Sequence, residues 1–436
     1  MNTALKNEDI QLITAFRHDL HQHPELSGKE YRTCGKIREF LSALPGCRIL
    51  DLPVETGVVA QIPGTEELNC VPGCDAGQHR RVTKFASGNS KSACKTEFWE
   101  EVMLRADIDA LPQTECVDIP WKSSVPGVMH ACGHDLHTAA LCGAALLLCR
   151  MKQEGAVLPT IDLVFQPAEE GTTGARMLID AGLFSVIHPS ICFGMHNWPS
   201  VETGRVVCRE GAIMSAKRNF DIVVHGRGGH GSMPHLNVDP IVCAAAMIQS
   251  LQTVVSRNVN PIDAGILSIN MIEGGSPVNL VVDQVRMKAT VRSLSETVLD
   301  RMIERVEAIV ESISQAYECR TEIIWKERIP AVWNSPGMTK EAIRCAEESG
   351  LILADAVPSL SSEDFALYRE YVPSFFFWLG SRAVGNEIHE LHTPQFFADD
   401  RAIVHGARLY AACADGRIQG SGLNQIERLH PLPPGR

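Results

Sequence analysis

The densest cluster of reactive side chains lies in residues 127–138, which read Gly-Val-Met-His-Ala-Cys-Gly-His-Asp-Leu-His-Thr. This short run holds one thiol, three imidazoles and one carboxylate, on His130, Cys132, His134, Asp135 and His137. Zinc, manganese and cobalt accept donors of these kinds. Core filling is a poor explanation, because a buried imidazole or carboxylate needs a partner to offset its lost hydration. The run therefore predicts a metal site, and the alternative is a surface loop that is polar by chance.

Two adjacent glutamates, Glu169 and Glu170, follow the apolar run 161–165, which is typical of a buried strand. Adjacent residues in an extended segment point in opposite directions. One carboxylate could therefore bind a metal while its neighbour faces the water on that metal. Paired glutamates are also common on protein surfaces, so a solvated pair is the alternative.

Two histidines occupy similar positions further along the chain. His196 follows the apolar run 191–195, and His392 comes after the strand-like run 374–379. A lone histidine is more often a structural residue than a ligand. Here, however, donor groups repeatedly follow apolar strands, and sites in open α/β sheets form at the carboxyl ends of strands. We therefore expect these donors to converge.

The elements that must position these donors alternate along the first half of the chain. Helices are expected at about 8–21, 29–44, 138–152 and 175–181, and strands at 57–62, 102–106, 161–165 and 191–194. This alternation predicts a layered α/β sheet.

From about residue 217 the pattern changes. The sequence predicts strand 220–225, helix 239–259, strands 265–272 and 285–292, helix 295–317 and strand 321–325. This βαββαβ order is the split ferredoxin-like motif. We therefore expect an inserted domain at 215–329, a larger α/β domain formed by 1–214 and 330–419, and a tail at 420–436.

Composition limits the possible functions. A chain of 436 residues exceeds one ordinary core, so two domains are expected. Its formal charge of −12 argues against nucleic acid or an anionic membrane as a partner. No apolar run approaches the roughly 20 residues of a membrane span. The first residues lack the apolar core of a signal peptide. The 15 scattered cysteines suit reduced thiols, so a cytoplasmic location is expected.

Several motifs give a specific resemblance. They are Arg105-Ala-Asp-Ile-Asp-Ala-Leu-Pro, Met129-His-Ala-Cys-Gly-His-Asp-Leu-His-Thr, Phe165-Gln-Pro-Ala-Glu-Glu-Gly, Gly194-Met-His-Asn-Trp-Pro, Gly229-His-Gly-Ser-Met-Pro-His and Ser362-Glu-Asp-Phe. Together, and in this order, they resemble the amidohydrolase branch of the metallopeptidase family that contains aminoacylases and carboxypeptidase G. Hippurate hydrolases, N-acyl-amino-acid amidohydrolases and plant auxin-conjugate hydrolases are similar by motif. The resemblance runs from about residue 18 to about residue 400.

The resemblance implies a di-metal catalytic domain with two divalent ions per subunit, zinc or manganese, with cobalt or nickel as further candidates. By the family pattern the ligands are Cys132, His134, Glu170, His196 and His392. Glu169 would be the general base. Asp107 and Asp109 would orient a histidine ligand, with Asp109 the more plausible counterpart of the family's catalytic aspartate. A strand-terminal turn is the alternative for this pair. Asp135, His137 and Glu363 are further candidates near the site.

The resemblance also implies that the inserted domain is a lid used for dimerisation, so a homodimer or a higher homo-oligomer is expected. In relatives, the histidine that corresponds to His230 reaches the partner subunit's site and helps to hold the scissile carbonyl oxygen. Asn279 and Arg292 resemble the residues that bind the substrate's free carboxylate, a task that suits an amide donor and a guanidinium. An exposed arginine at a strand end is often only a solvated charge.

Residues 64–98 depart from the family as a long polar insertion, for which we expect a mobile surface loop rather than a small metal knuckle on Cys70, Cys74 and Cys94. The whole chain is predicted to be a metal-dependent amidohydrolase that cleaves N-acyl amino acids, such as N-acetyl or N-benzoyl compounds, to a carboxylic acid and a free amino acid. The alternatives are a dipeptidase or carboxypeptidase with the same metal centre, and a catalytically silent protein that binds a small amide.

Overall fold

The computed structural model describes residues 5–65, 81–84, 96–276, 278–415 and 417–418. The chain divides into two compact units. Unit 1 comprises Met1–Gly211, Asn334–Ala356 and Leu367–Arg436, and unit 2 comprises Ala212–Trp333 and Val357–Ala366. The chain thus leaves unit 1 once for a long excursion and once for a short one. The predicted tail at 420–436 lies outside the described residues.

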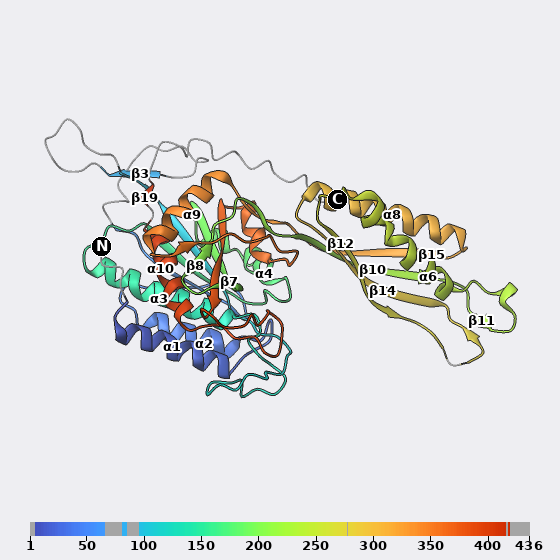
Figure 1. Ribbon diagram of the computed structural model, residues 1–436, viewed down its shortest axis with the longest axis horizontal. Helices are drawn as coiled ribbons and strands as arrows, with labels where there is room; N and C mark the ends of the chain where they lie inside the picture. The colour runs from blue at the N-terminus through green and yellow to red at the C-terminus, as the bar shows by residue number, and fades with distance from the viewer. Residues whose placement is uncertain (1–4, 66–80, 85–95, 277, 416, 419–436) are drawn as a thin grey trace. The chain divides into compact units, whose positions relative to one another are not determined.

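Unit 1 is built on a mixed sheet of eight strands (Figure 1). Its central strands run parallel to one another in the order β6, β5, β7 and β18, while β2 joins β6 in the antiparallel direction. The strands across the sheet are β1 (Arg48–Leu50), β2 (Val58–Ile62), β6 (Thr160–Gln166), β5 (Glu101–Asp107), β7 (Ile191–Glu202), β18 (Ser374–Arg382), β8 (Arg205–Val207) and β17 (Ile352–Leu353). Because strands buried on both faces need apolar side chains, β5 and β6 are mostly hydrophobic, and the buried Arg105 and Asp107 of β5 pair with each other.

Helices cover this sheet. They are α1 (Asn7–Gln22), α2 (Tyr31–Ser42), α3 (His134–Gln153), α4 (Gly174–Asp180), α5 (Leu183–Val186), α9 (Pro336–Glu348) and α10 (Arg401–Ala414). Helix α3 is buried along most of its length and packs against α10. Small residues allow this approach, since a Cβ on Gly143 would lie 3.0 Å from the Cβ of Ala407. Helix α3 begins at His134 rather than at residue 138, so His134, Asp135 and His137 lie in its first turn, while His130 and Cys132 precede it.

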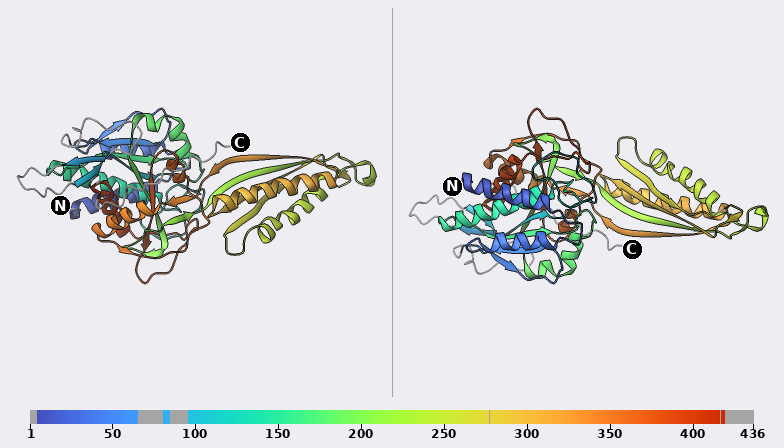
Figure 2. Two further views of the ribbon diagram at one scale, coloured as in Figure 1. Left: turned by 90° about the horizontal axis from the view of Figure 1, so that it is seen from above. Right: turned by 90° about the horizontal axis from the view of Figure 1, so that it is seen from below.

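Unit 2 contains a separate antiparallel sheet with strand order β12-β14-β10-β15. Its elements follow the predicted βαββαβ order: β10 (Ala216–His225), α6 (Pro240–Leu251), α7 (Thr253–Asn258), β12 (Gly265–Glu273), β14 (Gln284–Ser293), α8 (Glu296–Ala316) and β15 (Arg320–Ile329). Figure 2 shows its helices along one face of the sheet. On α8, buried residues recur three or four positions apart, as an amphipathic helix requires (Leu299, Met302, Ile303, Val306, Ile309 and Val310). The predicted fold class, an α/β sheet domain with a ferredoxin-like insertion, is confirmed.

Part of the predicted insertion is regular. Strands β3 (Arg81–Lys84) and β4 (Thr96–Trp99) pair in the antiparallel direction, and β19 (Arg417–Ile418) joins β4. The expectation of a loop is therefore wrong for these strands, because backbone pairing satisfies their polar groups. Cys70, Cys74 and Cys94 lie outside the described residues. Among the described helices, none is both long and apolar enough to cross a membrane.

Candidate metal centre

The predicted donors of unit 1 come together from four segments of the chain. Cys132 lies just before α3 and His134 is the first residue of that helix. Glu170 lies in the turn after β6, and His392 lies in the segment between β18 and α10. His196 lies within β7, opposite Trp378 of β18, and not beyond the end of its strand as the sequence indicated. This strand continues past the point where its apolar run ends.

Two of the imidazoles have a fixed orientation. Nδ1 of His134 lies 3.0 Å from Oδ1 of Asp109, and Nδ1 of His196 lies 2.7 Å from the carbonyl oxygen of Asn197. Each acceptor requires the proton on Nδ1, which leaves the lone pair on Nε2. Both rings therefore offer Nε2 as a metal donor.

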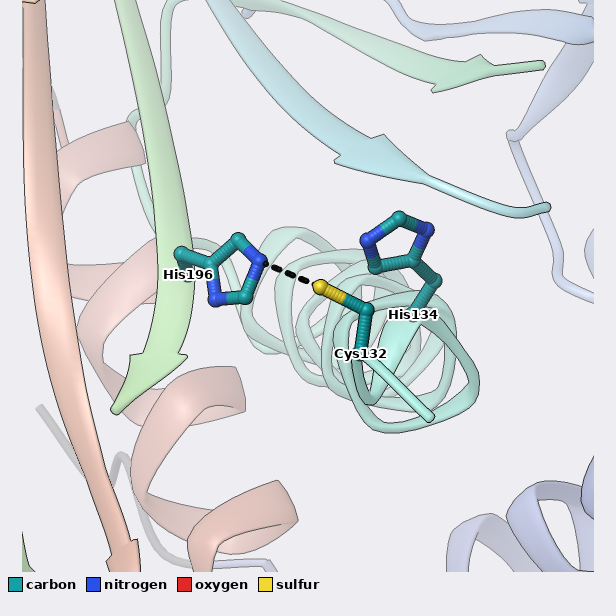
Figure 3. A group of neighbouring side chains, drawn as sticks. All are labelled: Cys132, His134 and His196. Carbon is teal, nitrogen blue, oxygen red and sulfur yellow. Dashed lines mark hydrogen bonds between the residues drawn. The ribbon is translucent and has the colours of Figure 1, made fainter. Parts of the chain in front are cut away.

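The thiol of Cys132 lies between two histidines. Its Sγ is 3.2 Å from Nε2 of His196 and 3.3 Å from Nε2 of His392. Figure 3 shows the sulfur directed at the His196 ring, with the His134 ring close by. Oε1 of Glu170 completes the group at 3.2 Å from Nε2 of His392. Five side chains thus present sulfur, nitrogen and oxygen donors to one region, in which Cys132, His134 and His196 are buried and His392 is about half exposed.

This donor set fits a pair of divalent cations. Nε2 of His134 is buried and has no hydrogen-bond partner within the described part of the chain. The nearest carboxylate oxygens, on Asp107 and Glu170, are 3.8 and 3.9 Å away. A buried polar atom without a partner costs about 1–3 kcal/mol, so such an atom indicates a missing ligand.

The donors form overlapping groups whose ligand atoms all lie within 4.8 Å of one another. Three of the groups are Cys132–His134–His196, Cys132–Glu170–His392 and His134–Glu169–Glu170, and a further group joins His134 to Asp107 and His137. Cys132 and Glu170 each belong to two of these four groups, and His134 belongs to three. Shared donors are what two adjacent ions would need when five protein ligands serve both.

Electrostatics also favour a cation here. Burial, together with the carboxylates of Glu170, Glu169 and Asp107, raises the pKa of the Cys132 thiol well above its usual value. Burial alone would lower the pKa of His134, but Asp107 and Asp109 outweigh it and raise this pKa to about 10. A bound divalent ion would reverse this balance and keep the thiol deprotonated.

The carboxylate of Asp109 holds two parts of the site. Besides its bond to His134, its Oδ2 accepts hydrogen bonds from the hydroxyl of Ser27 at 2.6 Å and from the backbone N–H of Glu170 at 3.0 Å. Burial would raise the pKa of Asp109, but the bonds from His134 and Ser27 lower it. Asp109 therefore lies where a residue that orients His134 must lie.

Asp107 and His137 support each other instead of offering donors. Nδ1 of His137 lies 2.5 Å from Oδ1 of Asp107, and its Nε2 accepts the backbone N–H of Asn197 at 2.8 Å. Both ring nitrogens are thus used within the protein. Arg105 donates to Oδ2 of Asp107 at 2.8 Å. Burial would raise the pKa of Asp107, but His134, His137 and Arg105 keep it well below its usual range.

The other two candidates, Asp135 and Glu363, are held by hydrogen bonds of their own. Asp135 bonds to Arg17 and His21 of α1, at 2.9 and 3.0 Å, on the side of α3 that faces α1. Glu363 is buried and belongs to unit 2, where its Oε1 accepts the backbone N–H of Phe365 at 3.1 Å.

Glu169 and Glu170 lie in a turn and not in an extended segment. Ala168 has φ 51° and Thr172 has φ 54°, and the Thr172 N–H bonds to the carbonyl of Glu169. The argument from alternating strand residues is therefore wrong, because β6 ends at Gln166. The turn nevertheless brings both carboxylates within 4.8 Å of a ring nitrogen of His134.

The candidate substrate-binding residues belong to unit 2. His230 lies on β11 (Gly229–His230), which pairs with β13 (Leu280–Val281). The N–H of Gly231 bonds to the carbonyl of Asn279 at 2.8 Å, so His230 and Asn279 lie near each other. Asn279 has φ 85°, a conformation that asparagine tolerates better than most residues.

Arg292 lies apart from these two. It occupies the carboxyl end of β14, whereas β13 connects to the amino end, at Gln284. At about 3.3 Å per residue, the strand separates the two ends by roughly 26 Å. The guanidinium of Arg292 donates to the carbonyl of Leu360 at 3.0 Å and to the hydroxyl of Ser362 at 3.4 Å. One chain therefore does not bring Arg292 together with His230 and Asn279.

Sequence reasoning missed Asn197. Its side chain bonds to the carbonyl of Cys132 at 2.5 Å and to the hydroxyl of Ser381 at 3.1 Å. A Cβ on Gly133 would lie 2.3 Å from its Nδ2, so the loop before α3 packs directly on this side chain. The available signal was its place directly after His196 in the Gly194-Met-His-Asn motif.

A mixed α/β sheet whose loops gather thiolate, imidazole and carboxylate donors beside a second carboxylate is the arrangement of a metallohydrolase. Residues 103–416 match the sequence profile of peptidase family M20/M25/M40, and the chain belongs to this family. It is therefore a hydrolase.

Individual relatives cover nearly the whole chain. The chain is 36% identical over 400 residues to an N-acetylcysteine deacetylase of Bacillus subtilis strain 168, covering 92% of this chain and 95% of the relative. It is 34% identical over 420 residues to thermostable carboxypeptidase 2 of Saccharolobus solfataricus, covering 94% and 97%. The crystal structure of a dinuclear metal-binding peptidase of the M20 family from Bacillus subtilis matches with TM-score 0.74 and 32% identity, covering 94% of this chain and 98% of that one.

Proposed function

We propose that the chain is a metal-dependent amidohydrolase that cleaves N-acyl amino acids into a carboxylic acid and a free amino acid. The observation that carries this proposal is the position of Glu169, within 4.8 Å of donor atoms on His134 and Glu170. The similarity to N-acetylcysteine deacetylase supports the substrate class, as does 31% identity over 395 residues to an N-acetyldiaminopimelate deacetylase of Geobacillus.

Cys132, His134, Glu170, His196 and His392 would hold two divalent ions, zinc or manganese. When bound, the ions would supply Lewis acidity towards the scissile carbonyl and lower the pKa of a water molecule. Asp109 keeps the proton of His134 on Nδ1 and so keeps Nε2 available.

Glu169 would take the proton from the attacking water as a new C–O bond forms at the carbonyl carbon. The same carboxyl would then give this proton to the amide nitrogen as the C–N bond breaks. The products are a carboxylic acid and an amine, and Glu169 ends as it began.

Paired substitutions test the two roles. Glu169→Gln should keep the metals and lower kcat by at least ~10²–10⁴-fold, the effect of losing a general base. Glu170→Gln should lose metal instead. Metal content by elemental analysis and kcat on N-acetyl amino acids separate these outcomes, and the opposite pattern would show that the pair is assigned in reverse.

We also propose that the active protein is a homodimer whose sites contain residues of both chains. The separation of Arg292 from His230 and Asn279 supports this, because two chains could supply the two ends of one substrate site. Mixtures of His230→Ala and Glu169→Gln chains, each nearly inactive, should regain activity after subunit exchange. An inactive mixture in which exchange is demonstrated would refute the shared site.

A carboxypeptidase or dipeptidase is the second candidate, favoured by the 34% identity to thermostable carboxypeptidase 2. The chain should be assayed on N-acetyl, N-benzoyl and indole-acetyl amino acids beside unmodified dipeptides, with each metal added back after chelation. A higher kcat/KM on dipeptides would replace the first proposal by the second.

A further inference from the structure

A segment between α1 and α2 forms a hydrogen bond with the turn that carries Glu169. This brace segment, residues 26–30, bonds to the site at two points. Leu26 forms a parallel bridge with Ala110, next to Asp109, and Ser27 donates its hydroxyl to Oδ2 of Asp109 at 2.6 Å. The brace segment is thus fixed to the end of β5 before it reaches the turn.

Glu30 makes the second connection. Its side chain is fully buried, and its Oε1 accepts two backbone N–H groups, from Gly28 at 2.9 Å and from Ala168 at 2.8 Å. One carboxyl oxygen therefore joins the brace segment to the residue directly before Glu169.

The residue that Glu30 holds is strained. Ala168 has φ 51°, in the left-handed region, which costs a residue with a Cβ about 1–2 kcal/mol. Such conformations persist only where the surroundings determine them. The hydrogen bond that the Ala168 N–H donates to Glu30 holds the backbone at this strained residue.

The residues on both sides of Glu169 are consequently held by hydrogen bonds. The N–H of Ala168, on one side, bonds to Glu30, and the N–H of Glu170, on the other, bonds to Asp109. Both acceptors are buried and come from other segments of the chain. The backbone of Glu169 is therefore fixed at both neighbours.

We propose that Glu30 is a positioning residue for Glu169: by accepting the Ala168 N–H, it fixes the turn that sets the direction of the Glu169 carboxylate. This inference rests on the proposed function, in which Glu169 is the general base. The role needs an acceptor oxygen and no negative charge.

Glu30→Ala should lower kcat about 10–100-fold with KM little changed, since a misplacement of about 1 Å can cost 10²-fold in rate. It should keep both metals, because the hydrogen bonds to the Glu30 side chain within the described residues come from Gly28 and Ala168, and neither is a proposed ligand. Glu30→Gln retains the acceptor oxygen and should stay within about threefold of the wild-type kcat.

Glu25 provides a matched control. Its carboxylate accepts the N–H groups of Arg32 and Thr33 in the first turn of α2, at 3.0 and 2.8 Å. Glu25→Ala thus removes a neighbouring carboxylate that also accepts two backbone N–H groups, but none from the Glu169 turn. Its kcat should be that of the wild type.

Hydrogen exchange of the metal-free protein gives a readout apart from activity. Amides in the peptide 166–174 should exchange faster in Glu30→Ala than in Glu25→Ala, Glu30→Gln or the wild type. In a Glu169→Gln background, Glu30→Ala should lower the residual rate no further, because the carboxylate to be positioned is already absent.

Wild-type kcat in Glu30→Ala would overturn the proposal, as would a loss fully explained by lost metal. An equal loss in Glu30→Gln and Glu30→Ala would also overturn it, because the role would then need charge. Failure of the proposed function looks different. Glu169→Gln would then be active, while exchange in 166–174 would still respond to Glu30→Ala.

Discussion

Replacing Arg17 by methionine should destabilise unit 1 by about 3 kcal/mol. The guanidinium of Arg17 is buried, and it bonds to Asp135 at 2.9 Å, to the carbonyl of Ala398 at 2.9 Å and to Asp400 at 2.5 Å. Removing one partner of a buried ion pair costs about 3–5 kcal/mol, since the other charge stays buried. In the variant, His21 still bonds to Asp135, so the expected loss of unfolding free energy lies at the lower end of this range.

Arg150 offers a control on the same two helices. It pairs with Asp9 at 2.6 Å, so it also joins α3 to α1, but the Arg150 side chain is 23% exposed, and only the Asp9 side of this pair is buried. Arg150→Met should therefore cost about 1 kcal/mol or less.

The assay is urea unfolding of the metal-free protein, followed by tryptophan fluorescence. Trp325 and Trp333 of unit 2 are replaced by phenylalanine in every variant, so that the signal reports unit 1. If Arg17→Met and Arg150→Met differ by less than about 1 kcal/mol, Asp135 does not carry an uncompensated charge, and the argument from burial is wrong.

Three other predictions follow from the site and its surroundings. Gly133→Ala should cost more unfolding free energy than Gly127→Ala, because both have a left-handed φ but only at Gly133 would the Cβ meet Asn197, at 2.3 Å; urea unfolding with equal costs would refute the clash. Burial would lower the pKa of His21, but Asp135 and Glu115 raise it to about 9, above its unfolded value of 6.5. Protonated His21 therefore stabilises the folded state fully below pH 6.5, and this contribution to the free energy of unfolding is lost as the pH rises through 9. His21→Asn should therefore cost more at pH 6 than at pH 10, and an equal cost at both would show that His21 is neutral. Cys132→Ser should lower bound metal towards one ion or fewer per chain, whereas His137→Gln should keep both ions; elemental analysis showing equal loss would make His137 a ligand.

The sequence predicted the fold because the spacing of apolar residues within each short segment indicates a helix or a strand. Alternating apolar runs and helices indicated the α/β unit, and the change of rhythm near residue 217 indicated the βαββαβ unit. The break between α6 and α7 at Gln252 was not predicted, since the apolar spacing continues across it.

For the site, residue types were more informative than conformation. Chemistry and position near apolar runs singled out the donors, the family resemblance selected the five candidate ligands among them, and the structure brings these five together. The turn at Glu169 could not be predicted, because an alanine with positive φ has no sequence signature. The role of Glu30 depends on a contact between residues 138 positions apart in the chain, which one sequence does not reveal. The same holds for the separation of Arg292 from Asn279, which depends on strand pairing.

The distribution of the donors along the chain bears on how the protein matures. Cys132, His134, Glu170 and His196 all precede unit 2, while His392 follows it, nearly half the chain later. Domains of a growing chain generally fold from the N-terminus onwards during synthesis. Here the β18 strand that pairs with β7 is also made after unit 2. A nascent chain therefore carries four of the proposed donors, including a thiol, for nearly half of its synthesis before the fifth is made. As a proposed metal ligand, Cys132 therefore needs protection against oxidation and against the wrong metal during synthesis, before the rest of the proposed site has been made.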